Sequence, residues 1–332
     1  LNPATHTFSN IEKVQTTHLN WDAKINFDLK QISGTAIWHF KNLTKEKYIH
    51  FDTYDLTIKK IKVNGKETQY FLTPLVKDYG SGLSIPIKEK DSMVSIEYST
   101  GALATALQWL TPEQTAGKLL PYLFTQCESI HARSLLPCQD APSNRITYEA
   151  QVQVPKGMMA VMSAHNPTEK NDQGIYQFKM EIPIPTYLIA LAAGDIAYKP
   201  IDERCGVYTE PSMLDNASKE LSDIPAMMNA AEALGGPYRW GKYDVLIAPP
   251  SFPIGGMENP RLTFATPTII TGDKSLVSLI AHEMAHSWSG NLVTNANWND
   301  LWLNEGFTTY FERRIMEKIT DKSYTEMLWE LG

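Results

Sequence analysis

Apolar and polar residues alternate through much of the first half of the chain. The alternation is clearest in residues 25–29, 94–98, 148–154 and 176–182. Successive side chains of a β-strand point to opposite faces of a sheet, so a period of two predicts strands with one buried face. The region from 14 to 196 is therefore expected to be mostly β-sheet.

The dipeptide Asn64-Gly65 adds a turn signal to this region. It follows Ile61-Lys62-Val63 and precedes a polar run. Both turn residues tolerate positive φ, which the two-residue turns of β-hairpins require. Antiparallel pairing is therefore expected around this turn.

The pattern changes after Pro200, which marks a domain boundary. Residues 219–234 are expected to form one helix that stops at Gly235-Gly236, with its regular part beginning near Pro225. A β segment is expected at 243–247, followed by a stretch rich in Pro and Gly.

A further helix is expected between Ser275, as its N-cap, and Gly290, as its stop. Its apolar face would consist of Leu276, Leu279 and Ile280. The last residues, 324–331, are expected to begin another helix.

Length and composition agree with two globular domains. The chain has 332 residues, of which 43% are hydrophobic and 20% charged, enough for two substantial cores. We expect a β domain over residues 1–197 and a second domain over 198–332. The net charge of −7, without any block of Lys or Arg, argues against nucleic acid and membranes as partners.

The cysteines and the apolar stretches bear on the compartment. Cys127, Cys138 and Cys205 are an odd count and too few for a disulfide framework, so reduced packing residues are expected. The longest apolar stretch, 187–193, is far short of the roughly 20 residues that cross a bilayer. No signal peptide opens the sequence, but it begins at Leu1 rather than Met, so an export signal could have been removed. A cytoplasmic location is expected, with a periplasmic or secreted one left open.

The strongest chemical signal is the pentapeptide His282-Glu283-Met284-Ala285-His286, followed by Glu305. Two histidines four residues apart lie about one turn apart on one helix face, so both rings can bind one ion. Two histidines and a carboxylate are a ligand set that catalytic zinc accepts, with the fourth position left to water. The sequence therefore predicts a zinc site formed by His282, His286 and Glu305.

Two further carboxylates are placed to assist such a site. Glu283 lies between the histidines without being needed as a ligand, so it is the candidate general base. Glu312 follows Glu305 by seven residues and therefore lies on the same helix face. It is the candidate acceptor for the outer N–H of a metal-bound histidine, and a solvated salt bridge is the alternative.

The run Gly255-Gly256-Met257-Glu258-Asn259 is a weaker signal, for a segment that binds a ligand. Paired glycines allow close approach of the backbone to a ligand, and Glu258 could reach the same space. An ordinary turn before a strand explains the glycines equally well.

Three motifs together resemble the signature of the gluzincin aminopeptidases, the superfamily of aminopeptidase N. They are residues 255–259, 282–286 and Trp302-Leu303-Asn304-Glu305-Gly306. Segments at 106–115, 135–140 and 290–295 are similar to the branch that contains leukotriene A4 hydrolase and aminopeptidase B. The likeness covers nearly the whole chain.

The resemblance implies an α+β protein in which a saddle-like antiparallel β domain precedes a thermolysin-like zinc catalytic domain. That domain would be incomplete at its C-terminus, with the family's C-terminal helical domain absent. It implies one Zn²⁺ per chain and peptides with a free N-terminus as substrates, and we expect a monomer. Glu258, with Glu128, would hold the substrate's α-amine. Gly255, Gly256 and Met257 would lie beside the peptide.

The expected activity is removal of the N-terminal residue from peptides by a metal-activated water. Glu128 and Ile254 stand where leukotriene A4 hydrolase has glutamine and tyrosine, which favours peptide over epoxide hydrolysis. The family's oxyanion-binding tyrosine should lie beyond Gly332. Tyr310 is not expected to replace it, because it is turned by roughly 140° from Glu305 around a helix and should serve packing. A bifunctional epoxide hydrolase and aminopeptidase, and a non-catalytic peptide-binding fragment, remain the alternatives.

Overall fold

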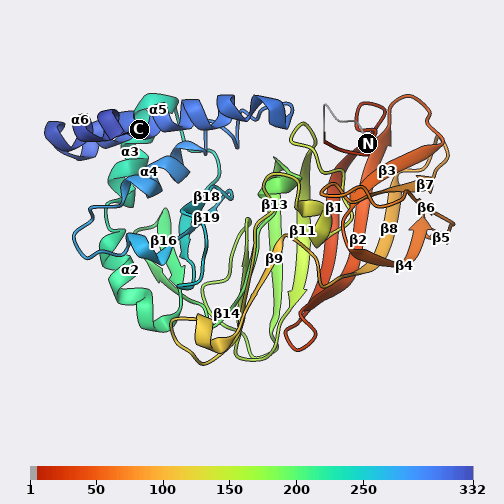
Figure 1. Ribbon diagram of the computed structural model, residues 1–332, viewed down its shortest axis with the longest axis horizontal. Coiled ribbons are helices and arrows are strands. Elements are labelled where there is room, and N and C mark those ends of the chain that lie inside the picture. The colour runs from red at the N-terminus through yellow and green to blue at the C-terminus, as the bar shows by residue number, and fades with distance from the viewer. Residues whose placement is uncertain (1–5, 332) are drawn as a thin grey trace. The chain divides into compact units, whose positions relative to one another are not determined.

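The computed structural model describes residues 6–331, and these fold as two compact units (Figure 1). The first unit contains residues 6–109, 123–193 and 296–299, and the second contains 110–122, 194–295 and 300–331. The segment 110–122 therefore belongs to the second unit, although it lies within the strand-rich half of the sequence.

The main sheet of the first unit has seven strands in the order β13-β11-β1-β2-β8-β4-β5 (Figure 1). Its buried face is formed by the alternating apolar residues, as the burial of every second residue in β11 shows. The strands are β1 (Val14–Asn26), β2 (Gln31–Asn42), β4 (Leu56–Val63), β5 (Lys66–Glu67), β8 (Met93–Thr100), β11 (Arg145–Gln153) and β13 (Ile175–Pro185).

The turn at Asn64-Gly65 is confirmed, with φ of 47° and 81° and antiparallel pairing of β4 with β5. One pairing in this sheet differs, because β1 and β11 run parallel. Strand β1 also ends at Asn26, so the expected continuation to Leu29 is wrong. Leu29 lies in the turn to β2 and is 69% exposed, since a tight turn leaves its side chain no core to enter.

The rest of the first unit consists of two small sheets and short helices. A three-stranded sheet contains β3 (Tyr48–Thr53), β7 (Ser81–Pro86) and β6 (Phe71–Leu72). A four-stranded sheet contains β12 (Met159–Met162), β14 (Leu191–Gly194), β10 (Tyr122–Thr125) and β9 (Leu107–Leu110), and some of its strands continue into residues of the second unit. The helices are α1 (Ala132–Leu135) and the 3-10 turn η2 (Thr186–Leu188).

The longest apolar stretch, 187–193, folds into η2 and β14. Within residues 6–331 no helix is long and apolar enough to cross a membrane. The three cysteines are buried and form no disulfide, as expected for packing residues.

The second unit is built on a five-stranded sheet with the order β15-β16-β17-β19-β18. Its central strands β16, β17 and β19 are parallel, and the two edge strands are antiparallel to their neighbours. The predicted strand at 243–247 is confirmed as β17, whose five residues are all buried. The strands are β15 (Ala197–Pro200), β16 (Cys205–Thr209), β17 (Tyr243–Ile247), β18 (Gly256–Met257) and β19 (Leu262–Ala265).

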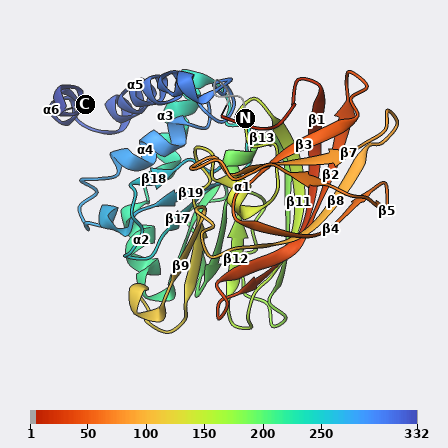
Figure 2. The same ribbon diagram turned by 45° about the vertical axis from the view of Figure 1, so that its right-hand side comes forward.

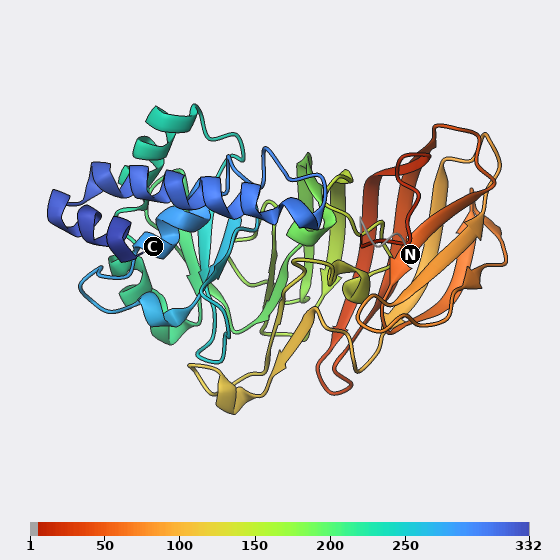
Figure 3. The same cartoon turned by 45° about the horizontal axis from the view of Figure 1, so that its top comes forward.

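Helices lie beside this sheet (Figure 2), and residues of the sheet and of the helices share one apolar core. Helix α5 contacts both α3 and α4, and α6 turns back against α5 (Figure 3). The helices are α2 (Leu214–Glu220), α3 (Ile224–Gly235), α4 (Ser278–Ala285), α5 (Leu301–Ile319) and α6 (Lys322–Leu331), with 3-10 turns η1 (Pro112–Gln114), η3 (Pro211–Met213), η4 (Pro267–Ile269) and η5 (Trp298–Asp300), the last of which begins in residues of the first unit.

The single helix expected at 219–234 is wrong, because α2 ends at Glu220 and α3 begins at Ile224. Pro225 explains the break: it lacks an N–H and fits only the first turn of a new helix, where no donor is needed. The helix ends where it was predicted to end, with Gly236 at a φ of 84° after the last turn of α3.

Candidate active site

Helix α4 carries the pentapeptide, but it is shorter than the sequence suggested. It begins at Ser278 rather than at Ser275, which does not cap it, and Leu276 is largely exposed. Glu220 explains the late start, because its buried carboxylate accepts hydrogen bonds from the loop 271–274 and holds that loop in a non-helical turn. The helix ends at Ala285, so His286 is its C-cap residue rather than an interior one.

Helix α5 brings the other site residues against α4. Its buried polar residues Asn304, Thr308 and Glu312 are spaced four apart and so form one row on the helix. Glu305, next to the first of them, is part-exposed at the same end of α5. The packing of α5 on α4 thus places a polar row beside the two histidines.

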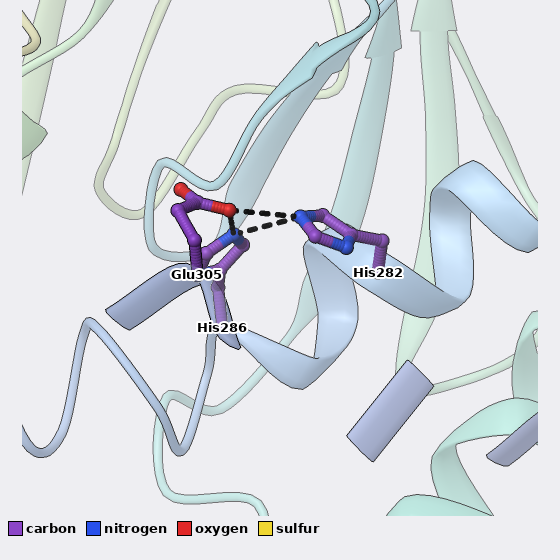
Figure 4. A group of neighbouring side chains, drawn as sticks. All are labelled: His282, His286 and Glu305. Atoms are coloured by element: carbon purple, nitrogen blue, oxygen red, sulfur yellow. Dashed lines mark hydrogen bonds and ion pairs between the residues drawn. The ribbon is translucent and has the colours of Figure 1, made fainter. Parts of the chain in front are cut away.

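Three side chains converge on one point (Figure 4). Nε2 of His282 lies 3.2 Å from Nε2 of His286 and 3.4 Å from Oε2 of Glu305, and the remaining edge, from His286 to Glu305, is 3.8 Å. Tetrahedral ligands at roughly 2.0–2.2 Å from a shared zinc ion lie about 3.3–3.6 Å from one another. The donor set and its spacing therefore fit zinc.

The outer nitrogens of both histidines are occupied by other groups. Nδ1 of His282 lies 3.0 Å from Oε2 of Glu312, whose other oxygen pairs with Arg313. Nδ1 of His286 lies 3.1 Å from the carbonyl oxygen of Ser289. Since acceptors hold each Nδ1–H, both Nε2 atoms keep their lone pairs for the point of convergence.

Glu283 lies buried behind the histidines, against the glycines of the second motif. A Cβ on Gly256 would stand 2.2 Å from Oε1 of Glu283, so only a glycine leaves room for this carboxylate. Carboxylate and ring atoms of Glu258, Glu283 and His286 all lie within 4.8 Å of one another. A possible proton acceptor is therefore present beside the converging ligands.

Glu258 is a second buried carboxylate, 4% exposed, in the same group. Its Oε1 has no hydrogen-bond partner in the part of the chain that the structure describes. Asn291 donates to its backbone oxygen at 2.7 Å and fixes this segment. Met257 is buried in β18 beside it, while Gly255 is exposed.

The electrostatics of this group favour a bound cation. Burial acts to lower the pKa of the His282 ring, but hydrogen bonds to Glu305 and Glu312 and the charge of Glu283 raise it to about 10. Burial and neighbouring His282 lower the pKa of His286 to about 4. Either a proton on His282 or a bound metal ion would compensate the negative charge of Glu283, Glu305 and Glu312.

Glu258 differs from the other carboxylates of the group. Burial, together with the charge of Glu305, raises the pKa of the Glu258 carboxyl to about 7. The pKa of Glu305 itself is lowered, chiefly by its hydrogen bond to His282. Glu258 would therefore gain most from a positively charged ligand.

Two predicted residues are not members of this cluster. Glu128 belongs to the first unit, in the loop between β10 and α1, and its role stays a prediction. Tyr310 is 53% exposed, and its ring lies 6.0 Å from that of Trp329 on α6. It therefore packs against a neighbouring helix, as expected, with about half of its side chain left exposed.

Sequence reasoning missed Asn304, Thr308 and Ser289, which surround His286. A signal was present for two of them. Asn304, Thr308 and Glu312 recur every four residues in α5, and a polar row on a buried helix face indicates partners for a buried polar group. Ser289 contributes only its backbone oxygen, so its identity carried no signal.

Comparison with known proteins gives two family matches. The model described as "Peptidase M1 N-terminal domain" matches residues 15–188, and the one described as "Peptidase family M1 domain" matches residues 221–331. The first of these alone covers more than half of the chain.

Individual proteins agree with these matches. Leukotriene A-4 hydrolase from Xenopus laevis and leucine aminopeptidase 2 from Aspergillus terreus are each 44% identical, over 96% of this chain and 54% of their own length. The solved structure of leukotriene A4 hydrolase from Saccharomyces cerevisiae superimposes with a TM-score of 0.93 at 38% identity, over 100% of this chain and 53% of that chain. The chain thus spans about half the length of the relatives it matches.

Proposed function

This chain belongs to peptidase family M1, and we propose that it carries the metal centre and amine-binding residues of a zinc aminopeptidase, which removes the N-terminal residue from peptides. The observation that carries the proposal is the convergence of Nε2 of His282, Nε2 of His286 and Oε2 of Glu305 within 3.8 Å of one another. The name of the Aspergillus terreus relative, leucine aminopeptidase 2, supports it.

One zinc ion per chain would be held by His282, His286 and Glu305, with Glu312 holding the outer N–H of His282. When bound, zinc lowers the pKa of a coordinated water and polarises the substrate carbonyl. Glu283 accepts the proton of the attacking water and passes it to the leaving amine, because its buried carboxylate lies beside the histidines and needs no place in the ligand set.

Glu258 would bind the α-amine of the peptide. Its buried carboxylate has an oxygen without a hydrogen-bond partner among residues 6–331, and an ammonium group supplies both the missing donor and the compensating charge. Glu128 is proposed to assist it. Gly255, Gly256 and Met257 would lie along the peptide backbone. Binding a free amine at a fixed distance from the scissile bond limits cleavage to one residue at a time.

A second activity has support in the names of the relatives. The Xenopus laevis protein is named leukotriene A-4 hydrolase, so hydrolysis of a fatty epoxide is the competing or additional function. We place it second because Ile254 and Glu128 differ from the residues expected for that reaction. A cytoplasmic location and a monomeric state stay predictions, the former favoured by three buried thiols.

Zinc content and turnover test the proposed function together. The full-length protein should contain one zinc by elemental analysis and hydrolyse aminoacyl-arylamides, and a chelator should abolish turnover. Glu283→Gln should retain zinc but lose 10²–10⁴-fold in kcat, the usual contribution of a general base. Glu326→Gln, an exposed helix substitution, is the control. Turnover that survives complete zinc removal, or full activity in the Glu283→Gln variant, would contradict the assignment.

A further inference from the structure

The outer nitrogen Nδ1 of His286, at the end of α4, has neutral hydrogen-bond partners rather than a carboxylate. Its Nδ1 lies 3.1 Å from the carbonyl oxygen of Ser289 and 3.0 Å from Oδ1 of Asn304. A carbonyl oxygen can only accept a hydrogen bond, so Nδ1 carries the ring proton. The lone pair of the ring is therefore on Nε2, which faces His282 and Glu305.

The same logic fixes the amide of Asn304. Because Nδ1 of His286 donates, Asn304 must turn its oxygen toward the ring and not its NH₂ group. Its Nδ2 is buried and has no hydrogen-bond partner in the described residues, so this side chain interacts with the ring through its oxygen. Thr308 adds a third contact: its hydroxyl donates to the carbonyl of Ser289 at 3.1 Å, and its oxygen, which can still accept, lies 3.2 Å from Nδ1 of His286.

Gly290 makes the space for this contact. It has a φ of 109°, in the left-handed region that favours glycine. A Cβ at this position would stand 2.5 Å from Oδ1 of Asn304 and 3.0 Å from Nδ1 of His286. Any larger residue at 290 would therefore push Asn304 and the His286 ring apart.

We propose that Asn304 is a positioning residue for the metal centre. Its Oδ1, in the space that Gly290 leaves, accepts from Nδ1–H beside the Ser289 carbonyl, and so holds the His286 ring in the orientation that directs Nε2 toward Glu305 and His282. The two ligands are thus controlled differently: a carboxylate holds His282, and a neutral amide holds His286. This inference rests on the proposed function, since it assigns Asn304 its role toward the zinc ion.

Asn304→Leu removes the acceptor and nearly keeps the side-chain volume. In the full-length protein, competition with a chromogenic chelator should show zinc affinity lowered by roughly 10–100-fold, the usual effect of losing an outer partner of a metal ligand. ¹⁵N NMR of the histidines in the zinc-free protein should show His286 as the Nδ1–H form in both proteins, because the Ser289 carbonyl remains, but with a shifted and broader Nδ1 signal in the variant. Asn304→Asp keeps an acceptor oxygen and should restore the wild-type Nδ1 signal.

Gly290→Ala is the second variant and should resemble Asn304→Leu in zinc affinity and in the Nδ1 signal of His286, although it removes no polar group. Asn144→Leu is the matched control, because Asn144 is a buried amide of the first unit that donates to Thr16. It should lower stability and leave zinc affinity unchanged.

A wild type that binds zinc, together with a folded Asn304→Leu variant of equal zinc affinity and unchanged Nδ1 signal, would overturn the inference alone. A wild type that binds no zinc would instead refute the proposed function, and the Nδ1 signal in the metal-free protein would still decide whether Asn304 orients the ring.

Discussion

Asp244, on the central strand β17, is a buried carboxyl whose ionisation should govern the pH dependence of stability. It is 5% exposed, and its Oδ1 has no hydrogen-bond partner between residues 6 and 331. Burial raises the pKa of this carboxyl from 3.8 to about 7, although the charge of Lys242 and the backbone N–H of Gly206 act in the opposite direction. Replacement by Asn keeps the shape and removes the ionisation.

The sign follows from proton binding. Between pH 4 and 7 the folded protein keeps a proton on Asp244 that the unfolded chain releases, so the free energy of unfolding falls as the pH rises through this window. Each pKa unit corresponds to about 1.4 kcal/mol. Above pH 7 the ionised carboxylate therefore costs on the order of 4 kcal/mol, a cost that Asp244→Asn avoids.

Urea unfolding of the wild type and of Asp244→Asn at pH 4.5 to 8.5 measures this effect. The variant should be more stable by only about 1 kcal/mol at pH 4.5 and by up to about 4 kcal/mol at pH 8. Asp172→Asn, at an exposed position of the first unit, controls for the loss of one negative charge. A difference between wild type and variant that is the same at every pH would refute the reasoning.

Two further predictions concern the surroundings of α4. Gly256→Ala should lower kcat on the order of 10²-fold with zinc retained, because the new Cβ displaces the Glu283 carboxylate. An unchanged kcat would show that Glu283 can move without loss of activity. Glu220→Ala should lower the free energy of unfolding, measured in urea, by about 1–3 kcal/mol, because it leaves donors of the loop 271–274 without an acceptor. A variant as stable as the wild type would mean that water replaces the carboxylate.

The sequence predicted most reliably the features that depend on local spacing. The turn at Asn64-Gly65 requires positive φ at two adjacent residues, and the strand at 243–247 is a short run, apolar except for Asp244, that ends before two prolines. The pentapeptide at 282–286 fixes two ring nitrogens through helix geometry alone. Each of these patterns contains its own physical cause within a few residues, so no tertiary information is needed to interpret it.

Features that depend on distant residues could not be predicted. The start of α4 is set by Glu220, more than fifty residues earlier in the chain, and Ser275 was therefore an incorrect cap. The parallel pairing of β1 with β11 leaves no trace in the alternation of either strand, because burial of one face looks the same in both directions. Asn304 contacts His286 only once α5 packs on α4, although the spacing of polar residues in α5 hinted at it.

The parallel pairing of β1 with β11 has a consequence for the order of events during synthesis. Strand β1 can form its hairpin with β2 as soon as both leave the ribosome, but its other edge stays open until residue 153 has been made. At roughly 5–20 residues per second this wait lasts about 6 to 25 s. Throughout that interval the nascent chain exposes an unpaired strand edge, and chaperone capture or mispairing between neighbouring nascent chains would act there first.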